Sequence, residues 1–387
     1  MQICYTDSLE KVPADAWNAV SGIDNPFVRH EFLVALERHD CLLPYGWQPI
    51  HVLVHDNHQL VGALPLYIKT NSRGEFVFDW AWADAYERMM GKNYYPKLVC
   101  SVPYTPVTGP RLLIAPHVER ASVAAALTGG AQAVAKKLQV SSLHYLFSNE
   151  IDTPFLRQQP GLMARMGYQF HWDNRGYSDF ADYLDRFKSK KRQQIRRERR
   201  DAQSCGATIE MLDGYQATAE HWAIFHDFYS STFLRKFNVP ALSLNFFKAI
   251  AKSMPEAIVL VMAHLDGRYV AGAFNLRGTD TLYGRYWGCG EHFRHLHFEV
   301  CYYQTLEFCI EYGLQRFEAG AQGEHKISRG FLPKATWSVH WLAQPAFALV
   351  INQFIDQETV AIHEYIEELK THSPFKGKGG RARIKQD

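Results

Sequence analysis

Two stretches of this sequence decide its fold: PIHVLVHDNHQLVGALPLYIK (49–69) and AIVLVMAHLDGRYVAGAFNLRG (257–278). Each reads as two apolar, strand-like runs around a short polar turn, which is the pattern of a β-hairpin. The turn residues are Asp56-Asn57 in the first stretch and Asp266-Gly267 in the second. The sequence therefore predicts two equivalent hairpins, and with them an internal repeat of the chain.

The repeat continues after each hairpin. An amphipathic or Ala-rich helix is expected in each half, a short strand after it, and then a last strand that ends in His-Trp. The expected ranges are 117–138, 141–149 and 167–172 in the first half and 297–313, 314–320 and 337–341 in the second. This order of elements is that of the GNAT acyltransferase fold. We therefore expect an α/β protein of the α+β type, with mixed, largely antiparallel sheets in a tandem GNAT-like fold.

Three parts follow from this interpretation. Residues 1–175 form an N-terminal GNAT-like domain, with an aromatic-rich insertion between its hairpin and its helix. Residues 176–350 form a second GNAT-like domain that opens with a basic helix. Residues 351–387 supply a C-terminal helix and a basic, Gly-rich tail.

Composition limits the classes of function. The chain has 387 residues, enough for two ordinary cores, and its 42 basic and 40 acidic side chains exclude a general polyanion-coating role. The first residues lack the pattern of a secretion signal, and no run approaches the ~18 apolar residues of a membrane span, so a cytoplasmic protein is expected. Seven cysteines without a CxxC pair favour reduced thiols, and no metal site is predicted. The histidines of EHFRHLHFE (291–299) fit a loop entering a helix better than a zinc cluster.

Charge is nevertheless concentrated at one place. Residues 188–200 hold eight Lys or Arg in thirteen positions, with a thin apolar stripe that predicts a helix with a basic face. Such a face is either a solvated surface or a site for a phosphate-rich ligand, since guanidinium groups grip phosphate oxygens. In the second case the donor-binding residues are Arg192, Arg196 and Arg199, together with Arg294.

The second half carries the densest run of titratable groups. Glu324, His325 and Lys326 follow a predicted strand in a Gly-bounded segment, and turn geometry alone does not require them. Glu324 or His325 is suited to deprotonate an amine, whereas Lys326 or Arg329 is suited to polarise a carbonyl or to hold a phosphate or carboxylate. Gln322 lies in the same segment and is a candidate for substrate binding.

The other candidates come from neighbouring elements. Glu299, a further catalytic candidate, begins a predicted helix and shares a face with Tyr303, although an acidic residue there also complements the helix dipole. Strand alternation would point Arg285 and Trp287 into the cleft and Tyr286 away from it. We expect this cleft between strand 283–289, the start of helix 297–313 and segment 318–331. In the first half, Asn149 and Glu150 take the places of Gln322 and Glu324, and Tyr104 is expected over the cleft between the halves.

Several stretches together resemble one known family. They are YYPKLVCSVPYTPVTGPRLL (94–113), QFHWDNRGYSDFADYLDRFKSKKRQQIRRERR (169–200), LYGRYWGC (282–289), LHFEVCYYQTLEFCIEYGLQRFEAGAQGEHKISRGFLP (296–333) and TWSVHW (336–341). The chain is identified by them as a member of the FemAB-like predicted N-acyltransferases, labelled peptidoglycan biosynthesis or recognition proteins. The related Fem enzymes have two GNAT-like domains and move an amino acid from aminoacyl-tRNA onto a peptidoglycan precursor. Their Phe-Lys-x-Gly-Phe motif matches the stretch from His325 to Phe331, which is one residue longer, lacks the first Phe, and places Lys326 at the lysine. Their tRNA-gripping helical arm has no counterpart here except the basic helix.

The resemblance implies an acyl- or aminoacyl-transferase that acts on an amine acceptor, which is a small molecule, a peptide or a cell-wall precursor. No tightly bound cofactor is expected; the co-substrate is either aminoacyl-tRNA, which makes tRNA a partner, or acyl-CoA. Two alternatives remain: an acyl-CoA-dependent GNAT acetyltransferase that never meets tRNA, and a non-catalytic protein that binds peptides or cell-wall precursors. The segment GCGEHFRHLH (288–297) is a weak match to the Gly-rich phosphate loop of the first alternative.

Overall fold

The computed structural model describes residues 1–291, 293–321 and 323–376, and both predicted hairpins are present in it. Strand β3 (His51–Asp56) pairs antiparallel with β4 (Gln59–Leu64), and β11 (Ile258–Leu265) pairs antiparallel with β12 (Arg268–Arg277). Both turn residues have positive φ in each hairpin, 46° and 64° at Asn57-His58 and 49° and 80° at Asp266-Gly267. Positive φ at both central positions matches the right-handed twist of the flanking strands, which explains why Asn, Asp and Gly stand there.

The strands form two sheets, and the fold is the mixed, largely antiparallel α/β arrangement expected from the sequence. A four-stranded sheet has the order β1-β3-β4-β7, and an eleven-stranded sheet has the order β10-β11-β12-β13-β14-β9-β15-β8-β6-β5-β2. The strands not yet given are β1 (Gln2–Thr6), β2 (Trp47–Pro49), β5 (Leu66–Lys69), β6 (Lys97–Cys100), β7 (Leu113–Ile114), β8 (Ser142–Leu146), β9 (Leu162–Asp173), β10 (Thr208–Leu212), β13 (Thr281–Cys289), β14 (Arg316–Glu318) and β15 (Leu332–Leu342).

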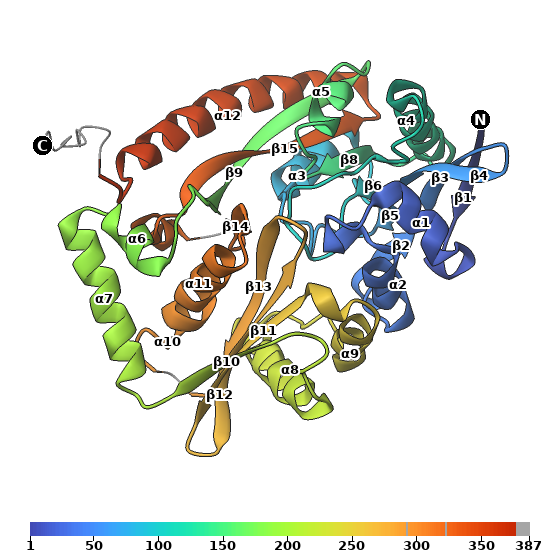
Figure 1. Cartoon of the computed structure of the whole chain (residues 1–387). Coiled ribbons are helices and arrows are strands. Elements are labelled where there is room, and N and C mark those ends of the chain that lie inside the picture. The colour runs from blue at the N-terminus through green and yellow to red at the C-terminus, as the bar shows by residue number, and fades with distance from the viewer. Residues whose placement is uncertain (292, 322, 377–387) are drawn as a thin grey trace, which may run out of the picture.

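The last strand of each half crosses to the other half, a feature that the repeat did not reveal. Strand β9, which ends the first half, lies beside β14 of the second half, and β15, which ends the second half, lies beside β8 of the first. The two exchanged strands pair with each other over ten residue pairs, from Leu332↔His171 to Trp341↔Leu162. One sheet therefore runs through both halves (Figure 1). The division at residue 176 stays a prediction about folding units.

Helices cover both faces of this sheet. They are α1 (Ala14–Ser21), α2 (His30–Arg38), α3 (Trp80–Met90), α4 (Arg120–Lys137), α5 (Asp152–Arg157), α6 (Phe180–Asp185), α7 (Ser189–Gln203), α8 (Ala219–Leu234), α9 (Leu244–Ser253), α10 (Leu296–Phe298), α11 (Gln304–Glu311) and α12 (Pro345–Thr371). Between α10 and α11 the chain makes a π-helical turn, η5 (Glu299–Tyr303). The predicted main helices, the basic helix and the terminal helix are all present with shifted ends. The basic tail, 377–387, lies outside the described residues.

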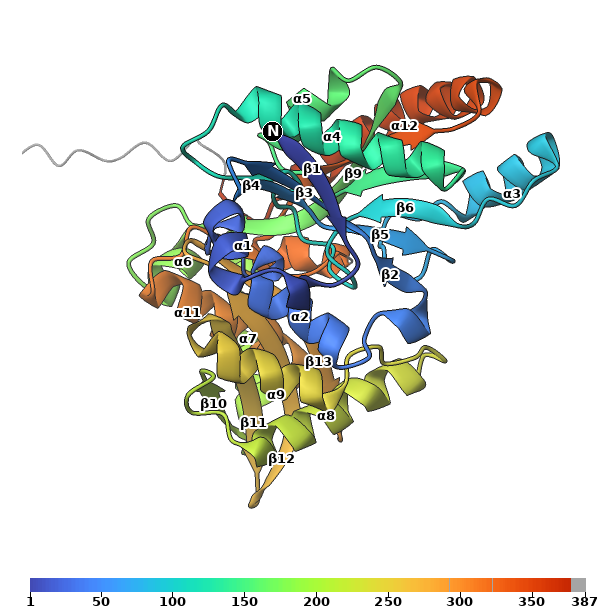
Figure 2. The ribbon, with the colours of Figure 1, turned by 90° about the vertical axis from the view of Figure 1, so that its right-hand side faces the viewer.

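Side-chain alternation along the strands explains the layers. In β11, Leu260 and Met262 pack into the core that holds α8 and α9, whereas Val259 and Val261 pack into the core that holds α11. The first of these cores continues into the N-terminal half, where Phe32 of α2 meets Phe246 of α9 with ring centroids 5.4 Å apart. Figure 2 shows α1 and α2 lying against the α8–α9 side of the second half. A helix with the length and apolar character needed to cross a bilayer does not occur in the described chain.

Candidate functional site

Strands β13 and β14 form the centre of the candidate site. They pair in parallel from Thr281↔Arg316 to Tyr283↔Glu318, and then β14 ends while β13 continues to Cys289. Gly320, with a φ of +82°, turns the chain away from β13, a conformation that glycine adopts at little cost. The two strands therefore open into a V, which we call the β13–β14 opening.

Lys326 lies at this opening. It belongs to the short 3-10 helix η6 (Glu324–Arg329), is 2% exposed, and donates a hydrogen bond from Nζ to the carbonyl oxygen of Gly320 over 2.7 Å. Burial disfavours the charged amine and lowers the pKa of Lys326 to about 7. Near neutral pH this side chain therefore exchanges readily between ammonium and amine, as functional lysines do.

The three segments that the sequence singled out meet around the opening. The ring of Trp287, on β13, lies 5.1 Å from the ring of His297 at the start of the helix. His325, on η6, is hydrogen bonded through Nε2 to the hydroxyl of Tyr302 at 3.1 Å. Burial lowers the pKa of His297 to about 4 and also lowers the pKa of His325. The predicted convergence of strand, helix start and segment 318–331 is therefore confirmed, and the histidines there are neutral at neutral pH.

Glu299 and Arg199 differ from the roles expected for them. The carboxylate of Glu299 is 1% exposed and accepts from Arg199 at 2.8 Å, and Arg199 also donates to Glu307 at 2.6 Å. The pair fastens α7 to the helix of the second half. The structure thus gives Glu299 a structural role in place of a catalytic one, and Arg199 the same role in place of donor binding, because their charges are already used.

A second buried contact holds η6 against α7. The guanidinium of Arg329 donates to Glu198 over 2.7 Å, and Glu198 also accepts from the hydroxyl of Tyr303. Arg329 further donates to the carbonyl oxygen of His325 at 2.7 Å. Arg329 and Tyr303, predicted to bind substrate, thus shape the backbone that carries His325 and Lys326. Gln322, predicted to act with them, lies outside the described residues.

The strand alternation expected at Arg285 is wrong. The pairing of β12 with β13 shifts register, from Phe274↔Tyr286 to Asn275↔Gly284, and leaves Arg285 as the extra residue of a β-bulge. The guanidinium of Arg285 and the hydroxyl of Tyr286 consequently both reach the carbonyl oxygen of Tyr104. Tyr104 does lie between the halves, where it also donates through its hydroxyl to Cys41 over 2.6 Å. It joins the halves rather than facing an open cleft.

The remaining predicted residues lie apart from the opening. Asn149 accepts backbone hydrogen bonds from Ile151 and Asp152 through Oδ1 and so holds the turn that precedes α5. Glu150 is exposed beside a separate cavity of about 670 Å³. Arg294 is exposed, with Nε 3.7 Å from Asp201.

The outer face of the basic helix α7 remains open to solvent. Arg192 bonds to Asp185 at 3.2 Å, while Arg196 is exposed. Its other exposed basic residues are Lys190, Arg197 and Arg200. Because α7 packs through Glu198 and Arg199 against η6 and η5, these cations border the elements that form the opening.

A groove of about 590 Å³ adjoins the opening, and the sequence gave no sign of it. Its floor is the exchanged pair β9–β15, with Gln169 and Ser338 among the floor residues. One wall is the loop Phe76–Phe78, and the opposite rim carries Glu324, which accepts a hydrogen bond from Tyr365 of α12. Strand exchange creates this floor, which explains why a search within either half misses it. Ala321, Gly323 and Glu324 line the groove, and the next residues of η6 include Lys326.

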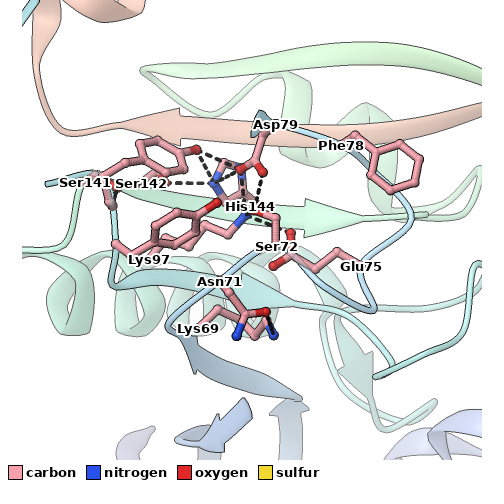
Figure 3. A network of polar contacts seen from close by, with 12 residues as sticks. Lys69, Asn71, Ser72, Glu75, Phe78, Asp79, Lys97, Ser141, Ser142 and His144 are labelled. Atoms are coloured by element: carbon pink, nitrogen blue, oxygen red, sulfur yellow. Dashed lines mark hydrogen bonds and ion pairs between the residues drawn. The ribbon is translucent and has the colours of Figure 1, made fainter. Parts of the chain in front are cut away.

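A buried polar network lies behind the loop wall of the groove (Figure 3). Lys97 Nζ lies 2.7 Å from Glu75 and 2.5 Å from Asp79, and it also donates to Ser72 at 2.9 Å. All three partners belong to the loop that continues into Phe76–Phe78. Desolvation raises the pKa of Glu75 to about 7, while the two carboxylates outweigh the desolvation of Lys97 and raise its pKa. Within the described residues, no group of three or more His, Cys, Asp or Glu side chains is arranged to hold a metal ion.

Comparison with known proteins gives a family and a set of structural relatives. A model of the FemAB-like family, described as peptidoglycan biosynthesis/recognition, matches residues 8–377.

The crystal structure of FemX superposes with a TM-score of 0.53 at 12% identity, covering 91% of this chain and 100% of FemX. The C-terminal domain of a lysylphosphatidylglycerol synthetase from Agrobacterium fabrum gives 0.51 at 10% identity, covering 88% and 96%. A tandem GNAT protein from the clavulanic acid biosynthesis pathway gives 0.42 at 11% identity, covering 89% and 99%. At such identities the first two relatives establish the fold alone. No curated protein sequence matches the chain.

Proposed function

The chain belongs to the FemAB-like family, and we propose that it is an aminoacyl- or acyl-transferase that joins a carboxyl group from an activated donor to an amine acceptor. The observation that carries the proposal is the β13–β14 opening with Lys326 at its base. Acyl transfer needs positive charge or hydrogen-bond donors where the carbonyl oxygen gains negative charge. A buried Lys326 with a pKa of about 7 meets this need as an ammonium and loses little of its strength to solvent.

The groove is the proposed place of the acceptor. It leads from the exchanged strands to segment 321–324, so an amine in it would lie beside Glu324 on the rim. The carboxylate of Glu324 is suited to orient an ammonium group, and its exposure lets a substrate reach it. A peptide from a peptidoglycan precursor is the proposed acceptor, because the family is described by peptidoglycan biosynthesis or recognition.

Aminoacyl-tRNA is the proposed donor. The exposed cations of α7 lie on the outer face of a helix that packs against η5 and η6, and they provide an extended surface for a polyphosphate backbone. An acyl-CoA donor is less well served, because a coenzyme A phosphate would need free backbone N–H groups at the helix start. There Leu296 already donates to Phe293, and Phe298 and Glu299 both donate to His295.

Radiolabel transfer tests the proposal. Purified protein is incubated with a peptidoglycan precursor peptide and either charged, labelled tRNA or labelled coenzyme A thioesters. Label that moves from tRNA to the peptide supports the proposal, and label that moves only from the thioester supports the acetyltransferase alternative. Tight peptide binding with no transfer from either donor would identify a binding protein and refute the proposal.

A further inference from the structure

A continuous chain of hydrogen bonds runs from the floor of the groove into the protein. Ser338, on β15, is hydrogen bonded to His340 Nε2 at 2.8 Å, and His340 Nδ1 lies 2.7 Å from Nδ1 of His144 on β8. His144 Nε2 lies 3.2 Å from the hydroxyl of Tyr94, which donates to Asp79 Oδ2 at 2.9 Å. This chain of hydrogen bonds thus connects the exchanged strand β15 and the strand β8, which is not exchanged, to the polar network of Figure 3.

The chemistry of the two rings gives this chain a direction. Burial holds the pKa of His144 and of His340 well below the ordinary value, so both rings are neutral and carry one proton each. If Ser338 donates to His340 Nε2, the proton of His340 is on Nδ1 and points to His144 Nδ1. The proton of His144 is then on Nε2, where it is shared between Ser142 Oγ at 2.7 Å and the hydroxyl of Tyr94 at 3.2 Å. Apart from the branch to Ser142, the hydrogen bonds accordingly point from the groove towards Asp79.

The inner end of the chain can take up a proton. Although burial acts to raise it, the charge and hydrogen bond of Lys97 lower the pKa of Asp79, so Asp79 passes a proton on and does not keep it. It shares Lys97 with Glu75, whose pKa is raised to about 7 and whose Oε1 has no hydrogen-bond partner in the described part of the chain. Other charged or titratable groups also act on this cluster: Lys69 of β5, Tyr95, and Arg165 of β9. Buried ion pairs of this kind add little stability compared with apolar packing, so their presence calls for another explanation.

We propose that Ser338, His340, His144 and Tyr94 form a proton relay that carries the proton lost by the acceptor amine from the groove to the Asp79–Lys97–Glu75 cluster. This proposal rests on the proposed function. As the amine nitrogen forms the new amide bond, its proton passes to Ser338 Oγ while the Ser338 proton passes to His340 Nε2. One proton moves at each later link to Asp79 Oδ2. Lys97, bonded to both carboxylates, then receives that proton from Asp79 as it gives one of its own to Glu75 Oε2. The donor's acyl bond breaks at the same time, and its leaving group takes a proton from water.

Ser338 touches the groove, so it is a catalytic residue in this proposal, and the two histidines and Tyr94 act through it. A relay and a merely structural network differ in one measurable way: only the loss of a relay changes how the transfer rate depends on pH. At high pH hydroxide ion from solvent can take the same proton, so a relay helps most at pH values where hydroxide is scarce. Its loss should therefore slow transfer at low pH more than at high pH.

The first test measures the pH profile of transfer from charged tRNA to the precursor peptide for Ser338→Ala. Its rate should fall about a hundredfold at pH 6.5, the range for one general base, and recover towards wild type by pH 9. Ser101→Ala is the matched control: Ser101 is another buried serine, and its hydroxyl has no hydrogen-bond partner in the described part of the chain. An equal loss at every pH for Ser338→Ala, or an unchanged profile, would overturn the relay.

The second test needs no substrate, so it separates failure of the relay from failure of the proposed function. In full-length protein labelled with ¹⁵N-histidine, titration near pH 7 should shift the ring nitrogens of His144 and His340 in wild type. Glu75→Gln should abolish the shift because it removes the titrating group. Tyr94→Phe should also abolish it, because it cuts the chain while leaving all charges in place. Shifts that persist in Tyr94→Phe would show an effect through space and would refute the relay, even if transfer were observed.

Discussion

Each half of the molecule contains one parallel pair of strands, and the two pairs have different surroundings. In the second half, β13 and β14 separate after Tyr283↔Glu318 and leave the opening at Lys326. In the first half, β6 and β8 pair from Leu98↔Leu143 to Cys100↔Tyr145, and the chain that follows β6 fills the corresponding space. The filling segment runs along β8 and forms a parallel bridge from Gly109 to Ser148.

Arg111 completes the filling of the first half. Its guanidinium is buried and donates to the carbonyl oxygens of Leu146 and Val107 at 2.7 Å each and of Pro110 at 3.0 Å. A positive group therefore stands in both halves, but Arg111 is saturated by the protein's own carbonyl groups. The comparison therefore assigns the proposed transfer site to the second half, whereas the proposed acceptor groove is built by both halves through β9 and β15.

The largest expected effect is a loss of transfer activity when Lys326 of the second half is replaced, compared with replacement of Lys69 of the first half. Lys326 and Lys69 are both largely buried, and desolvation lowers the pKa of each to about 7. Lys326→Met should reduce kcat for transfer about 10²- to 10³-fold, the effect of removing one oxyanion-stabilising donor. Lys69→Met is the matched control and should lose far less transfer, because Lys69 donates to Asn71 and the backbone of Arg73 and does not line the groove. Equal losses in both variants, with circular dichroism unchanged, would contradict the assignment of the site to the second half.

In the first half, we expect a substitution of Arg111 to lower the stability of the protein. Arg111→Met leaves three carbonyl oxygens without donors in a buried segment, and each unsatisfied group costs roughly 1–3 kcal/mol. We expect the free energy of unfolding, measured by urea denaturation, to fall by about 3 kcal/mol at the low end of that sum. A variant of wild-type stability that loses transfer would mean that Arg111 serves the chemistry and that the first half also has a site.

An effect of intermediate size is expected in the pH dependence of the transfer rate, because the site in the second half contains Lys326. Because the folded pKa of Lys326 is about 7 and the ordinary value is 10.5, the ammonium form is lost as pH rises through 7. The rate of transfer should then fall about tenfold per pH unit on the alkaline side, the slope for one essential proton. Stability changes in the opposite sense: between pH 7 and about 10.5 the unfolded chain binds more protons, so folding becomes more favourable.

Lys326→Arg checks this interpretation, since a guanidinium stays protonated throughout this range. Its alkaline limb should move to higher pH or vanish, even if the maximal rate is lower. An unmoved alkaline limb would assign the titration to another group.

Most of the fold could be predicted from the sequence, because hairpins and helices have local sequence signals. Alternating apolar residues and the Asp266-Gly267 turn specify β11–β12 without reference to the rest of the chain. The exchange of β9 and β15 has no local signal, because GYQFHW and WSVHW fit beside either β8 or β14. Only the packed whole decides between these neighbours, and the groove that depends on the exchange was missed with it.

The candidate site shows the same limit at the level of single residues. The density of charge in segment 324–329 drew attention to Lys326, His325 and Arg329, which stay predicted site residues. Charge alone, however, does not tell an active carboxylate from one already paired, and Glu299 proved to be bound to Arg199 from a segment 100 residues away. The relay residues His144 and His340 come from different halves, so their spacing along the chain carried no information.

The smallest expected effect concerns the basic helix α7. Among the described residues, the first half has no comparable basic helix beside the segment that contains Arg111, so this effect belongs to the second half. Arg196→Gln with Arg197→Gln removes two exposed cations, whereas Arg199→Gln removes a cation bonded to Glu299 and Glu307. If the outer face holds a tRNA, the double variant should bind charged tRNA more weakly while its unfolding curve stays that of wild type. Each lost phosphate contact lowers the log–log salt slope by about 0.7 on single strands, so the slope should become shallower by about 1.4.

Arg199→Gln should give the reverse pattern, a lower free energy of unfolding with the salt slope retained, because it uncovers a buried carboxylate and no phosphate contact. Filter-binding isotherms at several salt concentrations and urea denaturation measure the two quantities separately. A salt slope that does not change in the double variant would show that the outer face of α7 is a solvated surface. The donor would then have to reach Lys326 without help from α7, and tRNA would lose the observation that favours it over a thioester-linked donor.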